Sequence, residues 1–126
     1  MSKIYKNLNV FGNKLKICSN QPLTGYFRNG CCETSDKDFG KHLICSRVSD
    51  IFLKFSLKNG NDLITPQPHF KFPGLVEGDR WCLCVNRWIE ALENNCAPKI
   101  FLEATNQIVL KKVDVKILKR FALDLN

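Results

Sequence analysis

The sequence predicts a compact, two-layer α+β domain in which a small mixed or antiparallel sheet packs against helices, and three observations indicate this fold. The chain has 126 residues, a length typical of one globular domain, so residues 1–126 are expected to form a single unit. Short strand-like segments alternate irregularly with amphipathic helical segments, unlike the regular pattern of a parallel sheet. A long Pro/Gly-rich segment between them predicts an ordered loop rather than a linker.

Two segments have the composition of strands. "KHLICSRVS", residues 41–49, is an apolar run typical of a buried strand, and "KIFLEAT", residues 99–105, follows Pro98 and predicts another. Residues 50–58 are ambiguous because their apolar side chains alternate as in a strand. Ser49 before them and Asn59-Gly60 after them are typical helix caps, so we expect a helix there.

Two further helices are predicted in the second half of the chain. If Asp79 is an N-cap, helical spacing places four apolar side chains on one stripe. They are Trp81, Val85, Trp88 and Leu92. We therefore expect an amphipathic helix that starts at Asp79 and ends near Asn95. Another helix is expected from Asp114, as its N-cap, through Phe121.

The segment 59–79 contains three prolines and three glycines, which exclude long regular elements. Its apolar side chains predict that it wraps across the core as an ordered loop. These expected anchors are Leu63, Ile64, Phe70, Phe72 and Leu75.

The formal net charge of +7 is concentrated at the two ends of the chain. The basic residues there are Lys3, Lys6, Lys14, Lys16, Lys111, Lys112, Lys116, Lys119 and Arg120. We interpret them as solvated surface, and a weak nucleic-acid-associated protein is the least favoured hypothesis. The sequence has neither a signal-peptide core nor an apolar run of membrane-spanning length, so we expect a cytoplasmic protein without a membrane partner.

Four stretches together resemble one protein family. They are "PLTGYFRNGCC", "GNDLITPQP", "FPGLVEGDRWCLCVNRWIEA" and "APKIFLEAT". Their order and length are similar to the bacterial family catalogued as domain of unknown function 2237, over residues of about 9–121. The resemblance implies a compact α+β domain with no established activity, substrate or cofactor. It also implies a histidine where this chain has Asn106 and a proline where it has Glu77.

Seven cysteines are an odd number, so a complete set of intrachain disulfides is impossible, and free buried thiols are expected in a reducing compartment. No pair of Cys-x2-4-Cys motifs exists, so we predict neither a metal site nor a cofactor. On a helix Cys82 and Cys84 would point apart, whereas on a strand they would share one face and a metal site would become plausible. The only reasonable ligands would then be Cys31, Cys32, Cys82, Cys84 and His42.

Thiol chemistry is one functional hypothesis. On the predicted helix, Cys82 occupies the third position, near free backbone N–H groups and Arg80. Cys31 or Cys32 would act as the resolving cysteine, and His42 would supply a base. The chain would then be a thiol-dependent enzyme or a redox protein. The alternative interpretation is that Cys82 is a buried inert thiol.

The leading hypothesis is a small ligand-binding module. Its site would lie between the loop 61–68 and the helix that starts at Asp79, because polar loop residues would there face charged and aromatic side chains. The expected binding residues are Asn61, Asp62, Thr65, Arg80, Trp81 and Arg87. The structural alternative is that the tryptophans fill the core and the arginines pair with nearby acids.

Overall fold

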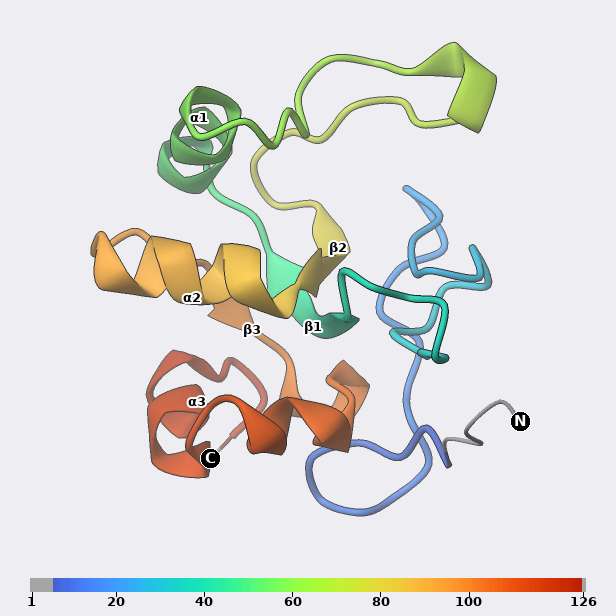
Figure 1. The fold of residues 1–126 in the computed structure, drawn as a ribbon, viewed down its shortest axis with the longest axis vertical. Helices are drawn as coiled ribbons and strands as arrows, with labels where there is room; N and C mark the ends of the chain where they lie inside the picture. The colour runs from blue at the N-terminus through green and yellow to red at the C-terminus, as the bar shows by residue number, and fades with distance from the viewer. Residues whose placement is uncertain (1–5, 126) are drawn as a thin grey trace.

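A computed structural model describes residues 6–125 and has a mixed α+β fold. A three-stranded antiparallel sheet in the order β2-β1-β3 is surrounded by α-helices and long loops (Figure 1). The strands are β1 (His42–Arg47), β2 (Arg80–Cys84) and β3 (Lys99–Ile100). The predicted fold class, with a small antiparallel sheet and helices, is confirmed.

The central strand β1 pairs with β2 along most of its length. Ile44 lies opposite Leu83, and Cys45 lies opposite Cys82, with an irregularity between His42 and Ile44. Because neighbouring strand residues point to opposite sides, the Ile44–Leu83 pair and the Cys45–Cys82 pair face different layers of the molecule. This register separates an aliphatic face from a cysteine face.

The helix expected after Ser49 is confirmed as α1 (Asp50–Lys58). The Ser49 hydroxyl accepts a hydrogen bond from the backbone N–H of Phe52 at 3.1 Å, as an N-cap does. Phe52 and Leu53 are buried in the core. Local capping therefore decides the structure of this ambiguous segment.

The helix predicted to start at Asp79 is wrong in its first part. Residues 80–84 form β2, and the helix α2 (Val85–Glu93) begins only at Val85. The Asp79 carboxylate accepts the backbone N–H of Val76 at 2.9 Å, so it holds the preceding turn instead of capping a helix. Trp81, Cys82 and Leu83 are all buried, and such a continuous apolar run fits a buried strand as well as a helix.

The second predicted strand is also shorter than expected. Only Lys99–Ile100 belong to β3, and residues Leu102–Ala104 form a 3-10 turn. The Asp124 carboxylate accepts the backbone N–H groups of Leu102 and Glu103, at 2.8 and 2.9 Å, which removes these donors from the sheet. The third helix, α3 (Val115–Phe121), is confirmed with Asp114 as its N-cap.

The main hydrophobic core lies between the aliphatic face of the sheet and the helices. Its largest fully buried side chains include Ile44, Phe52, Leu83, Trp88, Ile100 and Leu118. Trp88 also donates its indole N–H to the Pro98 carbonyl at 3.2 Å and packs edge-on against Phe121. Within residues 6–125, no helix has the length and apolar character needed to cross a membrane.

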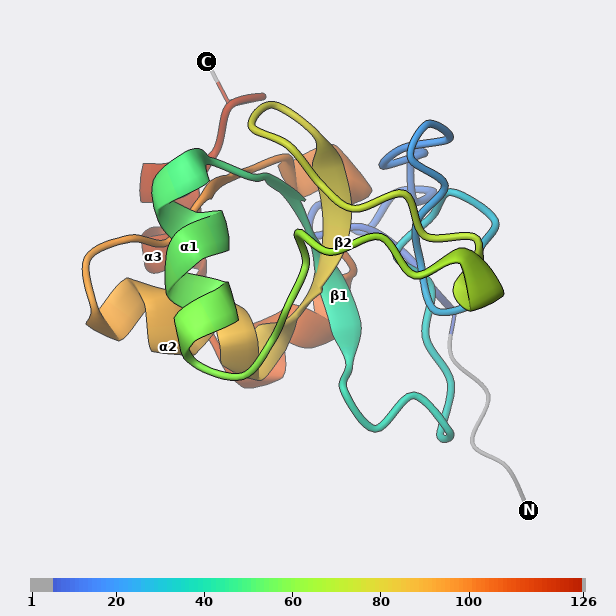
Figure 2. The ribbon, with the colours of Figure 1, turned by 90° about the horizontal axis from the view of Figure 1, so that it is seen from above.

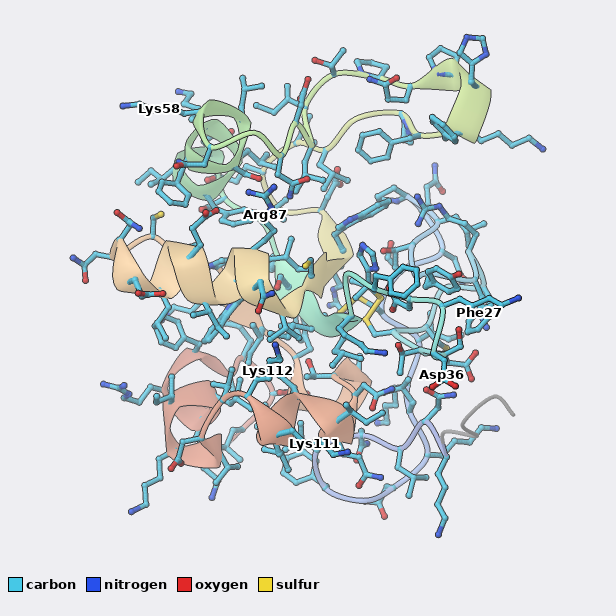
Figure 3. The ribbon with its side chains drawn as sticks, in the orientation of Figure 1. Phe27, Asp36, Lys58, Arg87, Lys111 and Lys112 are labelled. Atoms are coloured by element: carbon cyan, nitrogen blue, oxygen red, sulfur yellow. A yellow bond between two sulfur atoms is a disulfide. The ribbon has the colours of Figure 1, made fainter. Side chains whose placement is uncertain are left out.

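The N-terminal segment, residues 6–41, lies on the other side of the sheet from α1 and α2 (Figures 1 and 2). Its described residues form turns and isolated bridges instead of helices or strands. Two disulfides, Cys18–Cys45 and Cys32–Cys82, join it to β1 and β2 (Figure 3). Buried Asn106 also holds it, donating to the Cys32 carbonyl at 3.1 Å.

Residues 59–79 cross the upper part of the molecule in Figure 1 and contain a short 3-10 turn, Pro68–Phe70. Leu63, Phe72 and Leu75 are buried and anchor this stretch. Ile64 and Phe70 were expected as anchors too, but both are exposed, Phe70 by 72%. The tip of the loop thus presents an aromatic ring to solvent.

Candidate functional site

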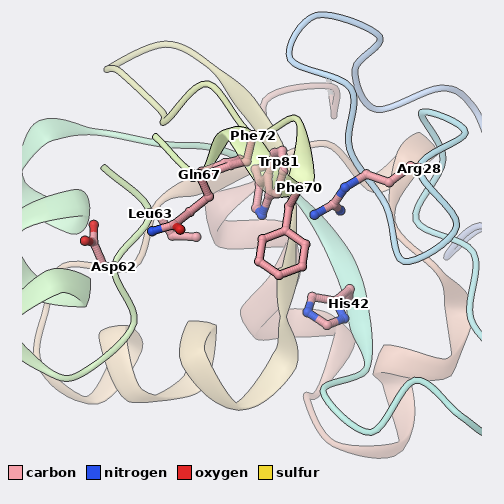
Figure 4. A pocket seen from close by; sticks show the side chains of 8 residues that line it. All are labelled: Arg28, His42, Asp62, Leu63, Gln67, Phe70, Phe72 and Trp81. Carbon is pink, nitrogen blue, oxygen red and sulfur yellow. The ribbon is translucent and has the colours of Figure 1, made fainter. Parts of the chain in front are cut away.

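A surface groove lies between this loop and β2, beside the N-terminal segment. It encloses a cavity of about 240 Å³. The lining residues are Arg28, His42, Asp62, Leu63, Gln67, Phe70, Phe72 and Trp81, shown in Figure 4. Three separate parts of the chain therefore meet there: the N-terminal segment, the first two strands and the loop.

His42 is held in the groove by a buried carboxylate. Its Nδ1 lies 2.6 Å from Oδ1 of Asp38, and Asp38 has no exposed surface. The other carboxylate oxygen, Oδ2, accepts the backbone N–H of His42 and the hydroxyl of Thr34, both at 3.0 Å. A carboxylate at Nδ1 fixes the ring orientation and leaves Nε2 for another partner.

Gly40 gives the imidazole its space. A Cβ at this position would lie 2.8 Å from Cε1 of His42, closer than real Cβ contacts. The residue has no unusual backbone angle, so its small size matters here rather than its flexibility. Asp38 and Gly40 therefore position the His42 imidazole, Asp38 by a hydrogen bond and Gly40 by leaving space for the ring.

Arg28 enters the groove from a tight turn. Gly25 begins this turn with φ of 99°, and a Cβ there would lie against the Cys31 carbonyl. The guanidinium of Arg28 donates to the Gly25 carbonyl at 2.7 Å and lies 5.0 Å from the ring centroid of Trp81. Partial burial lowers the pKa of Arg28 below its ordinary value, although the group remains a cation at neutral pH.

Strained backbone is concentrated around the groove. Among the described residues, five non-glycine residues have positive φ, and two of them are asparagines, which tolerate it. The other three are Arg28, Lys41 and Lys71, with φ between 50° and 54°. Arg28 lines the groove, Lys41 precedes His42, and Lys71 follows Phe70. Such strain is typical of functional sites.

Aromatic rings form the walls of the groove. Trp81 is buried and packs against Phe72 with 5.2 Å between ring centroids. In the view of Figure 4, the Phe70 ring lies above His42 and next to the Arg28 guanidinium. A neighbouring cavity of about 330 Å³ is lined by Tyr26, Arg28, His42 and Phe70, so the aromatic surface continues toward the N-terminal segment.

A second neighbouring cavity, of about 180 Å³, brings a thiol to His42. It is lined by His42, Asn61, Leu63, Trp81, Leu83, Cys84 and Arg87. Cys84 is a free, half-buried cysteine that lies directly opposite His42 in the β1–β2 register. It is also the N-cap residue of α2. The helix N-terminus expected near Cys82 therefore belongs to Cys84.

The predicted binding residues occupy different places. Asp62 and Trp81 line the main cavity, and Asn61 and Arg87 line the smaller one. Asp62 accepts the backbone N–H groups of Ile64 and Thr65, both at 2.9 Å, and these bonds and the Thr65 side chain lower its pKa. Arg80 lies outside both cavities, because the alternation of β2 turns it away from Trp81. Its guanidinium lies 3.9 Å from the ring centroid of Phe101.

Sequence reasoning missed Arg28, Gln67 and Asp38. The signals for two of them are local: the turn "TGYFRNG" has glycines on both sides of Arg28, and "DFGKH" places Asp38 four residues before His42. No local pattern relates Arg28 to Trp81, because their contact depends on the packing of the N-terminal segment.

The expected free thiols are only partly observed. Cys31, Cys84 and Cys96 are free and half-buried, and burial raises the pKa of Cys31 and of Cys96. Cys18, Cys45, Cys32 and Cys82 are bonded in pairs, so the expectation of free thiols is wrong for these four. Cys82 lies within β2 and is 1% exposed, so its predicted position near a helix N-terminus is wrong as well. Its bonded partner, Cys32, is one of the two resolving cysteines named by the thiol hypothesis.

The basic ends of the chain do not form the groove. Lys16 pairs with Glu103 at 2.8 Å, and the lysines and arginine of the C-terminal end are exposed on and before α3. Lys3 lies outside the described residues. The nucleic-acid hypothesis stays a prediction.

These features define a small mixed α+β domain with an aromatic groove and a positioned histidine. The model of a family described as "Uncharacterized protein conserved in bacteria" (DUF2237) matches residues 8–122, and the chain therefore belongs to this family. No curated protein matches the chain. Asn106, where the sequence resemblance implies a histidine, is fully buried. It donates to the Asn7 side chain and to the Cys32 carbonyl, which is a structural role in this chain.

Proposed function

We propose that the protein is a small cytoplasmic binding module whose groove takes a small molecule with a planar apolar part and an acidic group. The observation that carries this proposal is the convergence of Arg28 and His42 on the aromatic wall formed by Trp81 and Phe70. The proposed site lies between the loop and β2. The strand β2 forms the wall for which the sequence predicts a helix.

The charges favour an anion. Arg28 provides a permanent positive charge, and His42 presents Nε2 while Asp38 occupies Nδ1. Asp62, the acidic residue at the far end of the row in Figure 4, already accepts backbone N–H groups of its own loop. Bidentate pairing with a guanidinium is the usual way in which proteins recognise carboxylates.

The rings favour a planar group. Phe70 is largely exposed although it is a large apolar side chain, and its ring lies above His42 in the view of Figure 4. A ligand that stacks between Phe70 and the Trp81 side would cover apolar surface that is now in water, which is favourable. Lys71, directly after Phe70, has a positive φ, and its backbone N–H donates to the Pro68 carbonyl at 3.0 Å, which closes the turn at the loop tip.

A protein-observed NMR titration of the 15N-labelled chain with matched fragments tests this proposal. Aromatic carboxylates would be compared with their primary amides, on the wild type and on Arg28→Met. We expect the aromatic carboxylates to shift the backbone N–H resonances of residues 28, 42, 70 and 81. Their affinity should fall at least tenfold in Arg28→Met, on the order of 1.4 kcal/mol. Equal binding of the neutral amides, or no response in the groove, would overturn the proposal. Lys54→Met, on the exposed surface of α1, is the matched control.

Thiol chemistry is a second candidate, with Cys84 in place of Cys82. The observation that favours it is the cross-strand position of Cys84 opposite His42, whose ring is oriented by Asp38. In this arrangement the thiol would give its proton to Nε2 of His42, and the sulfur would displace a leaving group from an electrophilic ligand in the smaller cavity. The leaving group would then take the proton from His42.

Alkylation rates distinguish this candidate from simple binding. With iodoacetamide at about pH 6, Cys84 would react faster than Cys31 and Cys96, and His42→Gln would remove the difference. Peptide mass spectrometry reads each site separately. Equal, slow labelling of the three free cysteines would reject the thiol mechanism and leave the binding proposal intact.

A further inference from the structure

Four buried cysteines converge where the N-terminal segment meets the sheet. Cys45 and Cys82 come from β1 and β2, and Cys18 and Cys32 come from the N-terminal segment. All four are at most 3% exposed. The sulfur atoms of Cys18, Cys32 and Cys82 lie within 4.8 Å of one another, and the fourth sulfur, of Cys45, is bonded to that of Cys18. The two disulfides are therefore one compact four-sulfur cluster.

We propose that the reduced form of this cluster binds one Zn²⁺ through the thiolates of Cys18, Cys32, Cys45 and Cys82, and that the two disulfides are its oxidised, metal-free form. Zinc in such sites is tetrahedral with Zn–S distances of about 2.3 Å, which places the sulfurs about 3.8 Å apart. The Cys18 sulfur lies within 4.8 Å of both sulfurs of the Cys32–Cys82 pair, so only small side-chain movements separate this arrangement from tetrahedral spacing. A set of four thiolates also selects a soft metal ion over Mg²⁺ or Ca²⁺.

Backbone hydrogen bonds of three of the four cysteines add to the sulfur–sulfur bonds. The Cys45 N–H donates to the Thr105 hydroxyl at 3.1 Å, and the Cys82 N–H donates to the Thr24 hydroxyl at 2.8 Å. The Cys18 N–H donates to the Gly30 carbonyl at 2.7 Å. Reduction separates the bonded sulfurs by side-chain rotation, and the metal ion would then replace the two disulfides as the link between the N-terminal segment and the sheet.

The charges beside the cluster suit a metal thiolate better than neutral disulfides. Arg47 and Arg80 lie directly opposite each other on β1 and β2, on the face that carries Cys45 and Cys82. Like charges in this position repel, and within residues 6–125 neither arginine forms an ion pair with a carboxylate. Arg80 lies on Phe101, which packs against the cluster. A zinc ion with four thiolates carries two net negative charges, which these arginines would offset.

A dithiol or a phosphine can serve as the reductant that converts the two disulfides into the metal-binding thiols. Each disulfide accepts two electrons and two protons and becomes two thiols. A dithiol supplies both and becomes a disulfide, whereas a phosphine becomes its oxide, with one water molecule supplying the oxygen and the two protons. Binding of Zn²⁺ then displaces four protons from the four thiols. A reducing cytoplasm, the compartment proposed above, would hold the cysteines in the metal-binding form.

Anaerobic titration with Co²⁺, as a coloured substitute for zinc, tests the site. Wild type reduced with tris(2-carboxyethyl)phosphine is expected to bind one Co²⁺ per chain, with the intense visible absorption of tetrahedral thiolate coordination, and Zn²⁺ should displace it. The oxidised protein should bind none. Cys31→Ser/Cys84→Ser/Cys96→Ser removes the three cysteines outside the cluster and should titrate like wild type, whereas Cys32→Ser should lose stoichiometric binding.

The comparison of oxidised and reduced wild type needs no variant to fold, and circular dichroism reports whether the reduced chain keeps its helices. A reduced, folded protein that takes up no stoichiometric Co²⁺ would overturn the proposal. So would loss of the absorption in the triple variant, equal uptake by the oxidised protein, or a reduced chain that stays unfolded after metal is added.

Discussion

The two faces of the β1–β2 pair are held in different ways. On one face, Ile44 and Leu83 belong to the core formed with α1, α2 and α3. On the other, disulfides join Cys45 and Cys82 to the N-terminal segment, residues 6–41, which has no helices or strands. The first face is stabilised by buried apolar area. The second has a small apolar cluster of four cysteines and Ala104, with Phe101 at its edge. The N-terminal segment, which supplies Arg28 to the groove and Asp38 to His42, therefore relies on the two disulfides more than on apolar burial for its attachment.

Removing a large buried side chain from the face that packs against the helices should lower the free energy of unfolding most. Trp88→Ala removes a side chain with no exposed surface together with its hydrogen bond to Pro98. We expect a loss of about 3–5 kcal/mol in the free energy of unfolding, measured by urea denaturation. Ile51→Ala on the solvent side of α1, where Ile51 is 73% exposed, should change it by less than about 0.5 kcal/mol. A small effect of Trp88→Ala would show that this face is not the main source of stability.

Removing one sulfur link should have the next largest effect. Cys18→Ser/Cys45→Ser opens a connection between residues 27 positions apart, and the oxidised double variant should be less stable by about 2–4 kcal/mol. The matched control is Cys96→Ser, which removes a free thiol and should cost about 0.5 kcal/mol or less. Equal stability of the double variant and the control, in the same urea denaturation assay, would contradict a dependence on the link.

Gly40→Ala should affect the groove more than the fold. The added Cβ must push the His42 ring away from its position, because it would lie 2.8 Å from Cε1. We expect a loss of about 1 kcal/mol in stability. NMR should show a displaced His42 imidazole and weaker binding of aromatic carboxylates. Unchanged His42 resonances would show that Gly40 does not position the ring.

The smallest expected effect is the loss, at low pH, of the hydrogen bonds that Asp62 accepts near the start of the segment 59–79. Hydrogen bonds from Thr65 and Ile64 lower the pKa of Asp62 below its ordinary value, so their stabilising contribution is present above that value and is lost as pH falls through the lower folded-state pKa. The protection factors of the Ile64 and Thr65 amides, which relate each exchange rate to the intrinsic rate at the same pH, should therefore fall in acid. Asp62→Asn keeps an acceptor oxygen but does not titrate, and its exchange should lack this acid step. An identical step in the variant would assign it to another group.

The sequence correctly predicts the helices whose first residues are determined by a capping side chain. Ser49 and Asp114 cap their helices as predicted. The segment 80–84 was misjudged because it is buried on both faces, so its apolar residues satisfy helical and strand spacing alike. That error placed Cys82 near a helix N-terminus and hid the role of Cys84.

The candidate site was only partly predictable for a similar reason. Asp62 and Trp81 were identified from their residue types, but Arg80 was included because a helix would have placed it beside them. The contact of Arg28 with Trp81 joins residues 53 positions apart, and the two disulfides join residues 27 and 50 positions apart. Only the tertiary fold specifies such contacts.

Hydrogen exchange of the oxidised and the reduced, metal-free protein tests the central claim most directly. If sulfur links attach the N-terminal segment, reduction in the presence of a chelator should speed exchange of the protected amides of Cys18 and Gly30 at least tenfold, while the amides of α2 keep their protection. Unchanged exchange in residues 6–41, or an equal loss of protection in α2, would contradict the division of the molecule into two differently stabilised faces.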